Sequence, residues 1–224
     1  MATTITHTIQ PRHSYPEESL PESDGKPMAE TDLHREVMIY LLFALKEYFR
    51  DDPQIYVTGN IFFYYLDEAG ERQSVSPDVF VVRGVEKKTR RIYKMEDEGK
   101  APDVIFELTS PKTKMEDLGN KKYIYTKLGV HEYFLFDPYG ETLQPPLRGF
   151  RLEGNDYAPM VGARLSSEVL GLDLRVEEGK LRLYNRKTGE RLRSAEESEA
   201  ERRTIETENL RLREEVAKLR KKKP

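Results

Sequence analysis

The feature of this sequence that most constrains its fold is a pair of apolar runs separated by a proline and a helix-like segment. The first run, at 104–106, predicts a buried strand that ends before Pro111, because proline cannot donate to a ladder. Residues 114–128 have the periodicity of a helix, and residues 133–136 predict a second strand. This order of strand, helix and strand is typical of a parallel pair joined by a right-handed crossover.

Charged side chains flank the predicted strands. Glu107 follows the first apolar run, and Asp78 precedes 79–82, a uniformly apolar run that is typical of a central strand covered on both faces. The predicted helix carries three polar side chains on one face, at intervals of four residues: Asp117, Lys121 and Tyr125. We therefore expect two carboxylates and a lysine to lie near the ends of adjacent core strands.

These residue types have a chemistry in common. Asp78 and Glu107 could bind a hard divalent ion such as Mg²⁺, which takes oxygen ligands. Lys121 could stabilise phosphate charge or position an attacking water, and an ion and an ammonium beside a phosphodiester are sufficient for hydrolysis. A structural interpretation stays open, because Asp78 could cap a turn and Glu107 could form an ordinary ion pair with Lys121. Tyr125 is expected to pack and to hydrogen-bond rather than to react.

The whole chain predicts an α/β (α+β) domain at 30–193 between two extensions. Residues 1–29 are rich in Pro, Ser, Thr and Glu and predict a flexible N-terminal arm. A helix is expected from about residue 30 to 49, followed by a hairpin of strands 54–58 and 61–66 around a Gly-Asn pair. Further segments are predicted as an irregular basic loop at 87–100 and as short strands at 149–152, 157–160 and 181–184.

Composition excludes several classes of protein. The chain has no cysteine, which excludes disulfide scaffolds and thiolate metal sites. No apolar run approaches the ~20 residues that a membrane span needs, and the N-terminal sequence lacks the apolar segment of a signal peptide. We therefore expect a cytoplasmic protein with no membrane contact. The net charge of −3 gives no global indication of nucleic-acid binding.

The C-terminal segment, 194–224, predicts a helix and a candidate coiled coil. Five residues spaced four, three, four and three apart form a heptad seam: Ile205, Asn209, Leu212, Val216 and Leu219. In this register Glu208 can face Arg213 of a parallel second copy, and Glu215 can face Arg220. A homodimer through 195–221 and a single solvated helix both remain open, because the seam covers only about two and a half heptads.

The order of acids, strands and helix resembles the PD-(D/E)xK nuclease superfamily. More closely, the sequence is similar to the Uma-two family of bacterial restriction-endonuclease-like proteins. The resemblance covers about residues 15–193. The matching stretches are Asp24-Gly25 with TDLHRE at 31–36, SPDVFVV at 76–82, DVIFELTSPKTKMEDLGNKKYIYTKLGVHEYFLFDP at 103–138 and SEVLGLDL at 167–174.

The resemblance implies a restriction-endonuclease-like fold, with a central mixed β-sheet flanked by helices, and a metal-dependent endonuclease that hydrolyses DNA with Mg²⁺ or Mn²⁺. It implies that Asp78 and Glu107 are the metal ligands. The sequence departs from the superfamily pattern at Thr109, where a lysine is usual. The resemblance implies that Lys121, on the following helix, takes that role, with the adjacent Lys122 as the alternative.

Further contacts are predicted around this site. The resemblance implies that the first helix can lend a residue, for which His34 and Glu36 are the candidates. Four basic residues could contact a DNA backbone, although a solvated loop would also explain them: Lys87, Lys88, Arg90 and Arg91.

Two other functions remain open at this point. One is a catalytically silent nuclease fold that binds nucleic acid or a protein partner, and the other is an interaction protein that assembles through its tail. The choice between DNA and RNA is open as well.

Overall fold

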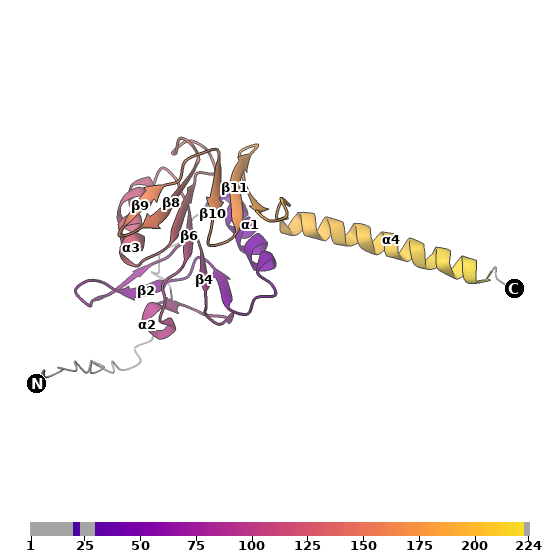
Figure 1. Ribbon diagram of the computed structural model, residues 1–224, viewed down its shortest axis with the longest axis horizontal. Helices are drawn as coiled ribbons and strands as arrows, with labels where there is room; N and C mark the ends of the chain where they lie inside the picture. The colour runs from indigo at the N-terminus through magenta and orange to yellow at the C-terminus, as the bar shows by residue number, and fades with distance from the viewer. Residues whose placement is uncertain (1–19, 23–29, 222–224) are drawn as a thin grey trace, which may run out of the picture.

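The structure is a computed structural model that describes residues 20–22 and 30–221 (Figure 1). The helices are α1 (Asp32–Tyr48), α2 (Met95–Glu98), the π-helix η1 (Glu116–Lys121), α3 (Lys122–Lys127) and α4 (Ala195–Lys221). The first strands are β1 (Ile55–Thr58), β2 (Phe63–Leu66), β3 (Arg72–Val75), β4 (Val79–Arg83), β5 (Tyr93–Lys94) and β6 (Val104–Leu108). The remaining strands are β7 (Glu132–Phe136), β8 (Leu147–Glu153), β9 (Asp156–Pro159), β10 (Arg164–Ser167), β11 (Leu172–Glu177) and β12 (Lys180–Asn185).

The domain is built on a six-stranded mixed sheet in the order β1-β4-β6-β7-β8-β9. The strands β6 and β7 are parallel, as the strand–helix–strand pattern predicts, and every other neighbouring pair in this sheet is antiparallel. The strands β4, β6 and β7 are buried along nearly their whole length, which explains why their sequences are continuous apolar runs.

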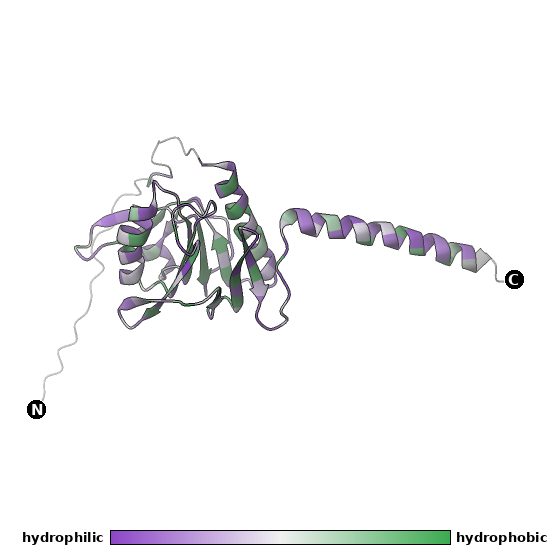
Figure 2. Ribbon diagram, turned by 90° about the horizontal axis from the view of Figure 1, so that it is seen from above, coloured by the Kyte–Doolittle hydropathy of each residue, from purple (hydrophilic) through white to green (hydrophobic). Residues whose placement is uncertain are grey.

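Both faces of the central sheet are covered. One face packs against α1 and a three-stranded sheet, β10-β11-β12, and the other packs against α3 and a second three-stranded sheet, β3-β2-β5. The hydropathy colouring shows the apolar strands gathered at the centre of the domain (Figure 2). The predicted central mixed sheet flanked by helices is therefore confirmed.

The predicted hairpin of residues 54–58 and 61–66 is wrong. The strand β1 pairs with β4 in the central sheet, whereas β2 pairs with β3 and β5 in a separate sheet. The Gly59-Asn60 pair redirects the chain between the two sheets, with Asn60 in the left-handed region at a φ of 54°. The turn signal in the sequence is real, but it does not say which strands pair across it.

The predicted irregular loop at 87–100 is also corrected in part. It contains β5 and α2, and the side chain of Tyr93 is fully buried. Tyr93 packs on Phe80 with ring centroids 5.6 Å apart and on Phe63 at 5.7 Å. One aromatic side chain thus anchors a segment whose other residues are mostly polar.

The tail forms the helix α4, which extends away from the rest of the molecule (Figure 1). The side chains of residues 200–218 are mostly exposed, including the apolar Ile205, Leu212 and Val216. No helix in the described ranges is long and apolar enough to cross a membrane. Most of the predicted N-terminal arm, 1–29, lies outside those ranges. Of its described residues, Pro21 accepts a hydrogen bond of 2.6 Å from the hydroxyl of Tyr64.

Candidate active site

The two predicted acids lie at one edge of the central sheet. The strands β4 and β6 are antiparallel, with Val79 opposite Phe106, so Asp78 just before β4 and Glu107 near the end of β6 lie at the same edge. One oxygen of Asp78 accepts a 2.6 Å hydrogen bond from the backbone N–H of Leu108, the residue after Glu107. This bond ties the start of one strand to the end of the other and fixes the position of the Asp78 carboxylate.

Glu107 is enclosed by the protein, with only 1% of the side chain exposed. Its Oε2 accepts a hydrogen bond from Lys121 Nζ at 2.8 Å, and its Oε1 accepts one from the hydroxyl of Tyr125 at 2.7 Å. Burial raises the pKa of Glu107 to about 8; the ammonium of Lys121 opposes this rise, and the charges of Asp78 and Asp117 add to it. Tyr125 therefore packs and hydrogen-bonds, as its position in the sequence predicts.

Lys121 remains a cation although its side chain is only 13% exposed. Burial alone would lower its pKa, but the nearby carboxylates of Glu107, Asp117 and Asp78 raise it above the ordinary value. The neighbouring Lys122 points elsewhere, with Nζ 4.3 Å from the centroid of the Phe150 ring. Of the two lysines, Lys121 is the one that the fold brings to the acids.

Asp117 is a third acid of this group that the sequence interpretation did not include among the site residues. Its side chain is 1% exposed, and its Oδ1 lies 3.3 Å from Lys121 Nζ. Neither carboxylate oxygen has a hydrogen-bond partner among the described residues. Burial raises the pKa of Asp117, and Lys121 opposes that rise. Its place four residues before Lys121 on the predicted helix face was the signal that could have identified it.

The helix that carries these residues is not a regular α-helix. Residues Glu116–Lys121 form a π-helix, in which each turn is wider than an α-helical turn. The carbonyl of Asp117 accepts a 3.0 Å hydrogen bond from the hydroxyl of Tyr133, a residue of the adjacent strand β7. Single π-helical turns are frequent at functional sites, and this one places Asp117 and Lys121 together beside Glu107.

The first helix contributes His34 to the same edge. Thr31 caps α1 by accepting a hydrogen bond from the backbone N–H of His34, so His34 lies in the first turn. Its Nε2 lies 3.5 Å from Asp78 Oδ1 and 4.0 Å from Glu30 Oε1. Burial lowers the pKa of His34, but contact with Asp78 and the charge of Glu30 outweigh burial and raise it overall. Glu30 is a further residue that the sequence interpretation missed.

Glu36 does not lie at this edge. It is exposed, and it lines a surface hollow between α1 and β12 together with Leu33 and Lys180. The reason is helical periodicity, because a residue two positions after His34 points to a different side of α1.

The four predicted DNA-contacting residues have different surroundings. Arg90 lies inside the domain, where it forms two hydrogen bonds with Glu98, at 2.7 and 2.8 Å, and packs 4.2 Å above the Tyr56 ring. Lys87 donates to the carbonyls of Phe49 and Arg50 after α1. The side chains of Lys88 and Arg91 are 52% and 80% exposed, so these two are the accessible members of the set.

A buried glutamate, two further acids, a lysine and a tyrosine thus lie together at one edge of the mixed sheet of an α/β domain. The chain belongs to the Uma2 family, because the sequence profile of that family, described as "Putative restriction endonuclease", matches residues 10–201. The resemblance seen in the sequence is thereby confirmed.

Four chains among the solved structures match this protein. One of them is the crystal structure of a "putative nuclease belonging to DUF820" from Anabaena variabilis ATCC 29413. It is 17% identical with a TM-score of 0.48, and the match covers 67% of this chain and 84% of that chain. This distant likeness adds nothing to the assignment beyond the family match. No curated protein is similar enough in sequence to match the chain.

Proposed function

We propose that the chain is a metal-dependent endonuclease that hydrolyses phosphodiester bonds in DNA. The observation that carries the proposal is the group of three carboxylates, those of Asp78, Glu107 and Asp117, around the single ammonium of Lys121. Buried acids without matching cations are costly unless they bind a metal or take up protons. A site with surplus negative charge at a sheet edge is suited to a divalent cation.

The donor set fits Mg²⁺ or Mn²⁺. Of the two buried oxygens of Asp117, Oδ1 lies 3.3 Å from Lys121 Nζ, and Oδ2 has no hydrogen-bond partner in the described part of the chain. Within residues 20–22 and 30–221, no group of three or more His, Asp or Glu side chains is arranged to hold a metal ion. Mg²⁺ retains several waters and binds through one or two carboxylates plus substrate phosphate, so the proposed site needs only two protein carboxylates.

In this proposal Asp78 and Glu107 hold the metal, which supplies Lewis-acid polarisation of the phosphate and a more acidic bound water. Lys121 stabilises the negative charge that develops on the scissile phosphate. Asp117 and Glu107 together hold Lys121 in place, at 3.3 and 2.8 Å from its Nζ. Tyr125 orients Glu107 through its hydrogen bond to Oε1. His34 is the candidate to accept or donate a proton beside Asp78.

The test combines metal binding with cleavage in the same samples. Mg²⁺ and Mn²⁺ are titrated by calorimetry into the wild type and Glu107→Gln, and the same proteins are incubated with supercoiled plasmid. We expect the wild type to bind metal and to nick the plasmid, and the variant to lose both. Metal binding that is the same in both proteins would contradict the assignment of Glu107.

Lysine substitutions provide a matched comparison. Lys121→Met should lower the nicking rate by a factor of about 100 or more, as expected when one preorganised charge is lost from the transition state. Lys122→Met serves as the control, because Lys122 lies over Phe150 and not at the acids. Equal rates for the two variants would remove Lys121 from the catalytic group.

A catalytically silent binding module is the second candidate function. It is favoured by the fact that both oxygens of Glu107 already accept hydrogen bonds from the chain itself. A protein of this kind would bind DNA but would bind neither Mg²⁺ nor Mn²⁺ at Glu107. The calorimetric titration therefore separates the two candidates.

We extend the proposal to assembly through α4. A second copy of the chain would cover the exposed seam residues Ile205, Leu212 and Val216 in a parallel coiled coil. A two-fold dimer suits an enzyme that cuts both strands of a duplex, because the symmetry of the protein matches that of its substrate.

A further inference from the structure

The outer face of the sheet β10-β11-β12 carries charged residues that the candidate active site does not use. Leucines alternate along these strands and point into the core: Leu165, Leu172, Leu174, Leu181 and Leu183. The residues between them therefore face away from the core. These outward positions include Arg164 on β10, Asp173 and Arg175 on β11, and Arg182 on β12.

Three of these arginines lie in one row across the sheet. Arg164 is the register partner of Arg175, and Arg175 is the register partner of Arg182. At a strand spacing of about 4.8 Å the row is about 10 Å long. Like charges placed directly opposite one another destabilise an antiparallel pair. The row therefore costs stability unless an anion lies against it.

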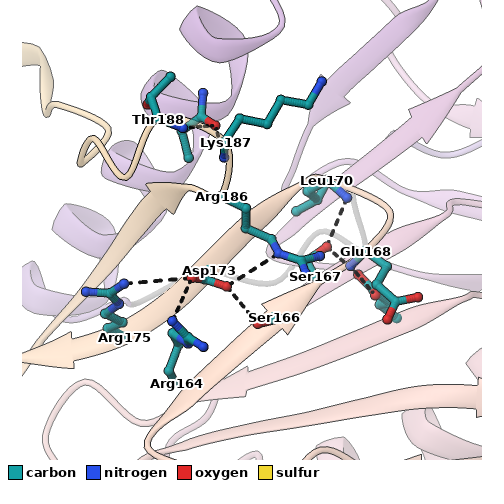
Figure 3. Close-up of polar contacts among 12 residues, drawn as sticks. Arg164, Ser166, Ser167, Glu168, Leu170, Asp173, Arg175, Arg186, Lys187 and Thr188 are labelled. Atoms are coloured by element: carbon teal, nitrogen blue, oxygen red, sulfur yellow. Dashed lines mark hydrogen bonds and ion pairs between the residues drawn. The ribbon is translucent and has the colours of Figure 1, made fainter.

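Figure 3 shows the carboxylate of Asp173 between the side chains of Arg164, Arg175 and Arg186. The side chains of Arg164, Arg175 and Arg186 converge on Asp173, with nitrogen-to-oxygen distances of 3.6, 3.7 and 3.8 Å. The hydrogen bond to this carboxylate comes from the hydroxyl of Ser166, at 2.7 Å. Asp173 thus holds three guanidinium groups together while neutralising only one of their charges.

The guanidinium groups retain donors for a ligand. The guanidinium group of Arg175 packs 4.2 Å from the centroid of the Tyr184 ring, and its side chain is 36% exposed. The side chains of Arg164 and Arg186 are 61% and 43% exposed, so their remaining N–H groups are accessible. Guanidinium groups bind phosphate oxygens in pairs of parallel hydrogen bonds, which makes phosphate the anion that this row fits best.

One end of the row lies beside α1. Arg182 lies 5.2 Å from the centroid of the Tyr40 ring on α1 and lines the same surface hollow as Leu33 and Glu36.

We infer that the arginine row of Arg164, Arg175 and Arg182 binds the phosphodiester backbone of duplex DNA. The row would hold the duplex while a neighbouring stretch of backbone reaches the acids and Lys121. This inference rests on the proposed function, since it names a substrate contact for the same enzyme. Its test uses binding alone, so that it can fail independently of catalysis.

The experiment measures binding of a fluorescently labelled 20-base-pair duplex to the full chain by anisotropy, in EDTA, over a range of salt concentrations. The variants Arg164→Gln and Arg164→Gln/Arg175→Gln are compared with Arg72→Gln/Lys127→Gln. Arg72→Gln/Lys127→Gln is the control, because it also removes two positive charges. Arg72 pairs with Glu96 and Lys127 pairs with Glu68, both away from the arginine row. Thermal unfolding verifies that each variant is folded, and the single variant changes only the most exposed arginine of the row.

Each phosphate contact that is lost should lower the slope of log affinity against log salt by about 0.9, so we expect a decrease of about 1.8 for the row double variant. Affinity at low salt should fall about tenfold or more for that variant and much less for the control. Equal losses in the two double variants, no binding by the wild type, or tighter binding to an RNA duplex of the same sequence would each overturn the inference.

Discussion

At the scale of single residues, metal binding at the proposed site depends on whether the carboxyl group of Glu107 is ionised. Its carboxyl group is enclosed by Lys121 and Tyr125, and burial gives it a higher affinity for a proton than a carboxyl group in water has. A metal and a proton then compete for the same oxygens. The site can thus exist in a protonated, metal-free form and in an ionised form that is stabilised by a cation.

This competition makes a prediction about stability and pH. The pKa of Glu107 is raised from 4.5 to about 8 in the folded protein, so between these values the folded state holds a proton that the unfolded state releases. The stabilisation is fully present below about pH 4.5 and is lost as the pH rises through about 8. Without divalent metal, the free energy of unfolding should therefore fall between pH 5 and pH 9, by at most about 1.4 kcal/mol per pH unit from this group.

The measurement is urea unfolding in EDTA at intervals from pH 5 to pH 9, for the wild type and Glu107→Gln. The amide of the variant cannot titrate, so its stability should depend less on pH than that of the wild type. Two parallel curves would show that Glu107 is ionised throughout this range. His34, whose pKa is also raised, contributes a slope of the same sign to both proteins. Asp117 shares Lys121 with Glu107, so its own contribution differs between the two proteins.

At the scale of elements, the connection between β1 and β2 positions the start of β4. A Cβ atom on Gly59 would lie 1.9 Å from the carbonyl oxygen of Asp78 and 3.0 Å from the Cα of Val79. The backbone N–H of Asn60 also donates a 2.9 Å hydrogen bond to the carbonyl of Pro77. The turn that sends the chain to a second sheet therefore packs directly against the backbone of a proposed metal ligand.

We predict that Gly59→Ala weakens metal binding although residue 59 is not a ligand. The methyl group meets backbone and cannot be accommodated by a rotamer change, so the start of β4 must move, at a cost of about 1–3 kcal/mol in unfolding free energy. Calorimetric Mg²⁺ titration and urea unfolding measure the two effects. Asn60→Gly is the control, because glycine adopts the φ of 54° at that position without strain. Unchanged metal affinity in Gly59→Ala would contradict this role of the turn.

The elements that the sequence predicts well are those whose burial is nearly uniform. The runs at 79–82, 104–106 and 133–136 are strands of the central sheet because continuous apolar sequence needs cover on both faces. The acids Asp78 and Glu107 follow from these strands, since their ends meet at one edge. The helix pattern from 114 also indicated that Lys121 faces the same direction as Asp117.

Other elements could not be predicted because their stability comes from tertiary contacts. The strand β5 is only two residues long and is held by the burial of Tyr93. The strand β3 is exposed at three of its four residues, so it lacks an alternating pattern. The π-helical turn at Glu116–Lys121 changes the hydrogen-bond register without changing the residue types that favour a helix. Glu30 lies four residues before His34, so the helical spacing from residue 30 onward could have predicted that these two side chains are close.

At the scale of the whole molecule, the helix α4 has an apolar seam that no other part of the same chain covers in the described residues. It makes few contacts with the rest of the domain, and the seam residues Ile205, Leu212 and Val216 are 54%, 46% and 47% exposed. Asn209 at the same seam is a device that favours a two-stranded, in-register coiled coil at some cost in stability. A solvated helix would need neither the apolar seam nor the asparagine.

If the chain dimerises through α4 as proposed, charge pairs between the two copies should control assembly. In the monomer Glu208 pairs with Arg211 of its own helix, a contact worth at most about 0.5 kcal/mol. In a parallel dimer it also faces Arg213 of the second copy. Glu208→Arg should therefore dissociate the dimer, and Glu208→Arg/Arg213→Glu should restore it, because the pair is re-formed with the charges exchanged.

Sedimentation velocity at several protein concentrations measures the oligomeric state of the wild type and the two variants, and plasmid cleavage gives a second readout on the same samples. A two-fold enzyme cuts both strands within one encounter, so the wild type and the charge-exchanged variant should convert supercoiled plasmid to linear product. The monomeric variant should release mainly nicked circles, since each encounter delivers one active site.

A wild type that sediments as a monomer at every concentration would contradict the dimer. If the Glu208→Arg monomer produced linear plasmid, double-strand cleavage would not require the coiled coil, because two copies would then cut both strands without being joined through α4.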